Sequence, residues 1–340
     1  MFVTAQPQAP AQQCVVRKGW GTIGTADVTD VEIVCGEFSY VANAASDTIS
    51  AYSVDATTGA FASGGAAVAA GLSPHAMTIG PDKSYLYVGN SDGNDVSVFA
   101  IDGSSGALTT VPGSPFAAGG KPTALSFYSA AYVVYGPPTL LRYLYVANAG
   151  SDNLSAYRLD LIPGTLNRFA AIPKPLSPAS YATGAGPSSL VVDEGYGPFL
   201  CTANSGGSND ISAYLIDIYT GNLTPIAGSP YPAANPGSLA FGAAGKFLYA
   251  ANAGGGAATI LGFSVDPSSG TLTGLPGFPV AVGASADSVS IDPTNQFLYV
   301  RNGSAGNVAG FEPNGATGAL NPMPGSPFAV GTSADFIGTC

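Results

Sequence analysis

Six short apolar segments that each end in asparagine recur along the chain. The clearest are Tyr-Leu-Tyr-Val-Ala-Asn at 143–148 and Phe-Leu-Tyr-Ala-Ala-Asn at 247–252. The others occupy 38–43, 85–90, 199–204 and 297–302. Each is followed by a polar turn and then by a segment in which apolar and polar residues alternate, as at 154–160. Alternation with a period of two predicts a half-buried strand, so every unit should contain two successive strands.

Each unit continues with the same pattern of turns and short strands. A turn centred on glycine leads into a short strand, and a Pro-Gly-Ser-Pro-Phe type of connector follows, as at 112–116 and 324–328. Proline ends a strand because it cannot donate to the sheet ladder. A final strand rich in small residues then opens the next unit, at 74–79, 122–127, 187–192, 236–241, 286–291 and 334–339.

Several strands per unit, repeated every 40 to 50 residues or so, are typical of a β-propeller. We therefore predict an all-β fold with six four-stranded blades, or seven if a further blade is built from another segment. The small residues suit innermost strands, because strands crowd near the axis. The chain starts its first unit at a second strand and ends on an innermost strand, which predicts that N- and C-terminal strands pair in one blade and close the ring.

Two domains are expected: an N-terminal extension at 1–37 and the propeller at 38–340. The extension contains alternating segments at 13–17 and 28–35 on either side of a glycine-rich stretch, which predicts a β-hairpin. A two-stranded hairpin is marginally stable alone, so it should dock on something. Self-association or binding of a protein partner through 1–37 is one hypothesis.

The Tyr-Val-Ala-Asn strands, together with Pro74-His75 and the segment 81–88, resemble the lactonase-like propeller family whose units are called YVTN repeats. The resemblance covers 38–340. It implies a propeller, usually of seven blades, in a family that includes enzymes similar to 6-phosphogluconolactonase and many bacterial surface proteins. The six repeats depart from that number. Residues 12–35 resemble the end of a bacterial β-sandwich repeat.

Composition excludes some partners and favours a compartment. The net charge is −11 and no cluster of Lys and Arg is present, which argues against nucleic acid. No apolar run approaches the roughly 20 residues needed to span a bilayer. Residues 1–10 lack the pattern of a signal peptide. Low Lys content and a Ser/Thr/Gly/Ala-rich surface favour an extracellular or cell-surface location.

The four cysteines show no metal-binding spacing. A disulfide between Cys14 and Cys35 is expected, with Cys35 and Cys340 as the alternative pair. Cys201 lies three blades away from the position of Cys340 in the repeat. No cofactor is predicted, although a divalent cation could bind.

The residue that follows Pro or Ala at the start of each innermost strand should surround one mouth of the central channel. We call these six positions the ring positions: His75, Thr123, Ser188, Gly237, Asp287 and Asp335. A carboxylate could orient His75 for general base catalysis, or Asp287 and Asp335 could hold a cation. Alternatively, the polar ring side chains only solvate a channel.

Lactone hydrolysis also needs a positive group for the developing oxyanion. Arg142 and Arg301 are candidates, although solvated charges at strand edges are the simpler interpretation. The repeated asparagines are interpreted as turn residues that bond to nearby groups. Two hypotheses remain: an extracellular scaffold or binding module, and a lactone hydrolase that uses His75, Asp287 and Asp335.

Overall fold

The computed structural model describes residues 14–17, 32–35, 37–54, 60–132, 139–161, 170–193, 195–252, 258–283, 285–292 and 294–330. In this part of the chain every regular element is a β-strand except one 3-10 turn, η1 (Gly303–Ala305). Two compact units are present, residues 1–118 with 159–174 and residues 119–158 with 175–340. The predicted all-β class is confirmed.

The first unit contains two sheets of the predicted order. In one, β3 (Glu37–Asn43) pairs with β4 (Thr48–Val54), which also pairs with β5 (Phe61–Ser63) and β6 (Val68–Ala69). In the other, the order is β7 (Pro74–Ile79), β8 (Tyr85–Asn90), β9 (Asp95–Ile101) and β10 (Leu108–Thr110), with β11 (Phe116–Ala117) also on β9. All of these pairings are antiparallel.

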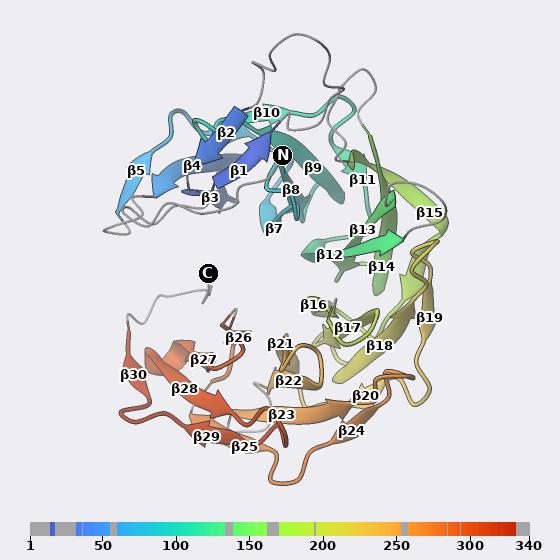
Figure 1. The fold of residues 1–340 in the computed structure, drawn as a ribbon, viewed down its shortest axis with the longest axis vertical. Coiled ribbons are helices and arrows are strands. Elements are labelled where there is room, and N and C mark those ends of the chain that lie inside the picture. Colours follow the sequence, from blue (N-terminus) through green and yellow to red (C-terminus); the bar gives the residue numbers. More distant parts are fainter. Residues whose placement is uncertain are drawn as a thin grey trace, which may run out of the picture. The chain divides into compact units, whose positions relative to one another are not determined.

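Four further sheets follow, most of whose strands belong to the second unit (Figure 1). The first is β12 (Pro122–Tyr132), β13 (Thr139–Asn148), β14 (Asn153–Leu161) and β15 (Ala170–Ala182). The second is β16 (Pro187–Asp193), β17 (Phe199–Asn204), β18 (Asp210–Ile216), β19 (Leu223–Pro225) and β20 (Tyr231–Pro232). The third is β21 (Pro236–Gly242), β22 (Phe247–Asn252), β23 (Ala258–Val265), β24 (Leu272–Gly274) and β25 (Val280–Gly283). The last is β26 (Ser288–Ile291), β27 (Leu298–Asn302), β28 (Asn307–Pro313), β29 (Leu320–Pro322) and β30 (Phe328–Ala329).

The asparagine that ends each second strand has a structural role. Asn90 donates from Nδ2 to Asp95 Oδ1 at 2.6 Å and to Ser97 Oγ at 2.9 Å. Asn148 and Asn204 make the same kind of contacts with the following turn and strand. These three asparagines are fully buried. Their interpretation as turn residues therefore agrees with the contacts, because buried amides need such partners.

The tyrosine of the repeated motif links one sheet to the next. Tyr145 on β13 donates its hydroxyl to Gly221 O at 2.7 Å, and Tyr249 on β22 donates to Gly318 O at 2.9 Å. Each acceptor lies in the glycine-centred turn of the following sheet. In β17 the same position is Cys201, whose thiol is fully buried, and burial raises its pKa. The motif thus fixes neighbouring sheets as well as forming a strand.

Strands β1 (Cys14–Arg17) and β2 (Glu32–Cys35) form a separate two-stranded sheet, in which Cys14 is the register partner of Cys35. The predicted closing strand at 334–339 and Cys340 lie outside the described residues. Six larger sheets are present in the described part, one for each asparagine-ended segment of the repeat. None of the described helices is long and apolar enough to cross a membrane.

Candidate active site

The ring positions coincide with an irregularity in strand pairing that recurs in the innermost strands. In β12 the pairing with β13 shifts between Pro122 and Ala124, so Thr123 is left out of the ladder. The same shift isolates Ser188 in β16, Gly237 in β21 and His75 in β7. Such bulges redirect a side chain and are frequent beside active sites. The register therefore explains why these residues occupy equivalent positions.

Two of the ring positions use their hydroxyl groups to join neighbouring strands. Thr123 Oγ1 donates to Pro187 O on β16 at 2.6 Å, and Ser188 Oγ lies 3.3 Å from Gly237 O on β21. β12, β16, β21 and β26 therefore lie side by side in this order (Figure 1). The hydroxyls of Thr123 and Ser188 satisfy backbone carbonyls, which favours a structural role for both.

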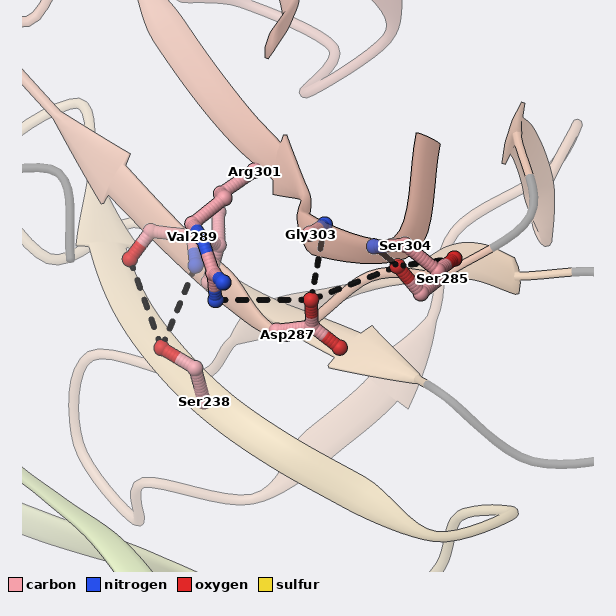
Figure 2. A network of polar contacts seen from close by, with 7 residues as sticks. All are labelled: Ser238, Ser285, Asp287, Val289, Arg301, Gly303 and Ser304. Carbon is pink, nitrogen blue, oxygen red and sulfur yellow. Dashed lines mark hydrogen bonds and ion pairs between the residues drawn. The ribbon is translucent and has the colours of Figure 1, made fainter. Parts of the chain in front are cut away.

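The next position along these strands adds a second row of links. Ser189 Oγ accepts a hydrogen bond from Leu239 N at 3.1 Å. Ser238 Oγ accepts one from Val289 N at 3.2 Å and lies 3.4 Å from Val289 O, as Figure 2 shows. Serine thus supplies the backbone of the neighbouring sheet with partners that a small apolar residue could not provide. These links fix the position of β26.

Asp287 directly precedes β26 at the ring position and, unlike the other described ring residues of this unit, is charged. Its Oδ2 atom lies 3.4 Å from Arg301 Nη1, 2.8 Å from Gly303 N and 3.3 Å from Ser285 Oγ (Figure 2). Its backbone N–H donates to Arg301 O at 3.0 Å. One carboxylate oxygen is therefore held by three donors. Charge-assisted hydrogen bonds of this kind fix a carboxylate strongly.

Arg301 is the partner of this carboxylate, and it is largely buried. Its side chain is 12% exposed, whereas that of Asp287 is 36% exposed. The interpretation of Arg301 as a solvated charge at a strand edge is therefore wrong, because β27 is a central strand between β26 and β28. Arg142 on β13 is also buried, at 7% exposure, so the same interpretation fails there. The position of each arginine in the repeat did not indicate that its side chain is buried.

Glycine at position 303 allows the pair to form. A Cβ atom there would lie 2.4 Å from Asp287 Oδ2 and 2.5 Å from Arg301 Nη2, closer than real Cβ contacts. The turn beyond is fixed by Ser304, whose N–H donates to Ser285 Oγ at 3.1 Å. Nothing in the repeat pattern indicated this contact, although Gly303 directly follows the motif asparagine. We call Asp287, Arg301, Gly303, Ser285 and Ser304 the Asp287 cluster.

The remaining predicted site residues are placed as follows. His75 is exposed at the start of β7, in the first unit, and Asp335 lies outside the described residues. Within the described part, no group of three or more His, Cys, Asp or Glu side chains is arranged to hold a metal ion. The cation site on Asp287 and Asp335 and the catalytic use of His75 stay predictions. What the structure does join is Asp287 with Arg301.

Comparisons with known proteins identify the family. The family model described as a lactonase, a seven-bladed β-propeller, matches residues 11–127, 139–286 and 245–334. This model indicates seven blades, the alternative given from the sequence, rather than the six that the repeats predicted, and six larger sheets are present among the described residues. No curated protein sequence matches the chain.

Solved structures support the same fold. A candidate 6-phosphogluconolactonase of Bacteroides fragilis is 19% identical, with a TM-score of 0.53 over 87% of this chain and 96% of that one. The periplasmic gluconolactonase of Pseudomonas aeruginosa is 19% identical, with a TM-score of 0.50 over 84% and 93%. Sqt1 of Saccharomyces cerevisiae, at 14% identity, reaches 0.54 over 88% and 70%. Similarity at these low identities shows the fold alone. The family is shown by the match to the family model, and the chain belongs to the lactonase family of seven-bladed β-propellers.

Proposed function

We propose that the protein hydrolyses lactones and that the Asp287 cluster carries the reaction. The observation that supports this assignment is the ion pair of a partly exposed carboxylate with a largely buried guanidinium, at the start of an innermost strand. Family membership points to the same activity. Acidic and basic groups held together in a fixed position are what ester-type hydrolysis requires.

The proposed reaction uses each group of the pair once. Asp287 accepts a proton from a water molecule, whose oxygen attacks the carbonyl carbon of the lactone. Once Asp287 holds this proton, the charge of Arg301 is no longer balanced by its partner, and the guanidinium stabilises the negative charge that develops on the carbonyl oxygen, as a preorganised cation can. The ring C–O bond then breaks, and the leaving alkoxide takes the proton back from Asp287. The product is the open hydroxy acid, and neither an oxidant nor a reductant is consumed.

The test is the rate of opening of a sugar-acid lactone, followed as acid release at constant pH and corrected for the uncatalysed rate. Asp287→Asn should lower kcat by about 10²–10⁴-fold, the usual contribution of a general base. Asp266→Asn, in an exposed turn of the same unit, is the matched control and should change little. His75→Ala tests the separate prediction for the sole histidine. Equal rates for wild type, Asp287→Asn and buffer would end the enzymatic proposal.

A scaffold or binding role at the cell surface is the second proposal, and the separate β1–β2 sheet favours it. Two strands alone are marginally stable, so this sheet gains from pairing with another chain. Sedimentation velocity of the chain with and without residues 1–37 tests self-association. Loss of a dimer or higher assembly on truncation would support the proposal, whereas a monomer in both forms would remove it.

A further inference from the structure

The charges of the Asp287 cluster are unequally accessible. The side chain of Asp287 is three times as exposed as that of Arg301, at 36% against 12%. Figure 2 shows the hydrogen bonds and the ion pair ending on one carboxylate oxygen, while the other oxygen points away from Arg301. A substrate that approaches the cluster therefore meets a negative charge before it meets the guanidinium. The cation is already neutralised by its partner.

None of the other described ring positions of this unit carries a positive charge. Thr123 and Ser188 carry hydroxyls that bond to backbone carbonyls, and Gly237 has no side chain. Lys121 precedes the ring residue of β12, but its Cγ lies 3.1 Å from the site of a Cβ on Gly150, so its stem follows the turn after β13. β12 is separated from β26 by β16 and β21.

The net charge of the whole chain also disfavours the binding of anions. The net charge of −11 repels a multiply charged anion and lowers its association rate. Phosphate recognition in proteins depends on Arg, Lys or backbone N–H groups aimed at the ligand. In the Asp287 cluster, the N–H of Gly303 and the guanidinium of Arg301 both bind the carboxylate instead.

From these observations we infer that the substrate is an uncharged lactone, such as that of an unphosphorylated sugar acid, and that phosphorylated lactones are discriminated against. This inference rests on the proposed function. The neutral hydroxyl groups of such a substrate can donate to the exposed oxygen of Asp287 without charge repulsion. A phosphate ester of the same lactone brings about two negative charges at neutral pH, as a phosphate monoester does.

The experiment compares glucono-lactone with its 6-phosphate at the same pH and ionic strength. We expect kcat/KM to favour the unphosphorylated lactone by about tenfold or more, as expected for electrostatic effects on association. Added salt should raise kcat/KM for the phosphorylated lactone and leave the neutral one unchanged, because salt screens the repulsion. Preference for the phosphorylated lactone would overturn the inference alone. Failure to open either lactone would overturn the proposed function as well.

A paired gain-of-charge experiment separates the local effect from the net charge. Ala305→Lys places a cation on η1, beside the Asp287 cluster, whereas Ala316→Lys places one in the turn at the other end of β28. Both alanines are exposed. Ala305→Lys should raise kcat/KM for the phosphorylated lactone several-fold and leave the neutral lactone unaffected, while Ala316→Lys should change neither. Equal effects of the two variants would contradict a local charge at the site.

Discussion

Removing the hydroxyl of Tyr249 should weaken the junction between two sheets. In wild type this hydroxyl donates to Gly318 O at 2.9 Å, and the tyrosine side chain is completely buried. Tyr249→Phe keeps the ring and deletes the donor, leaving a buried carbonyl in the turn of the next sheet. The lost hydrogen bond and the unsatisfied oxygen together should cost about 1–2 kcal/mol. The acceptor cannot easily be replaced, because Gly318 has a φ of 73°.

The free energy of unfolding, measured by urea denaturation, checks this value. A loss of about 1.5 kcal/mol corresponds to a decrease in Tm of about 2 °C for a chain of this length, from typical unfolding entropies per residue. The control is Tyr52→Phe, at a half-buried tyrosine whose ring packs edge-on against Phe61 at 6.0 Å. If Tyr249→Phe loses no more stability than Tyr52→Phe, the hydrogen bond does not stabilise the junction and the reasoning is refuted.

Three other predictions concern the site, the tyrosines and the hairpin. Gly303→Ala should lower lactone hydrolysis at least about tenfold with unchanged charges, because its Cβ would displace the Asp287 carboxylate; activity equal to wild type would contradict the cluster. Burial raises the pKa of Tyr249 and that of Tyr214 to about 12, so the stability from their neutral forms is present below pH 10 and is lost as the pH rises through 12. Absorbance at about 295 nm during alkaline titration should show this late ionisation, whereas titration near the ordinary tyrosine pKa of about 10 would contradict it. Non-reducing peptide mapping should recover Cys14 and Cys35 in one linked pair, since they are register partners; free thiols at both positions would refute the disulfide.

The strands could be predicted from the sequence because their periods follow directly from side-chain alternation. Segment 85–90 is β8, and 122–127 begins β12, as expected. The equivalence of the ring positions also follows, since one repeat register applies to every unit. The ends of two strands do not follow from the repeat: residues 128–132 and 139–142 lie outside the repeated pattern, yet they extend β12 and β13, with Tyr128 opposite Tyr143.

The pair at the candidate site could not be predicted in the same way. Asp287 precedes β26 and Arg301 lies on β27, and the sequence favoured a solvated charge at a strand edge for Arg301. Its burial depends on the fold of Gly303 over the guanidinium, which is a contact of the tertiary structure. A repeat pattern indicates only the features that all repeats share. Among the described residues, this ion pair occurs in a single repeat.

The ring position of Gly237 has space for a side chain. A Cβ at this ring position would meet a single atom within 4 Å, the backbone oxygen of Asp287, at the ordinary contact distance of 3.6 Å. A side chain could therefore be added beside Asp287 without breaking any link between strands. Thr123 and Ser188 lack this freedom because their hydroxyls hold the neighbouring strands. Evolution or design could thus change specificity at position 237 while the rest of the ring maintains the fold.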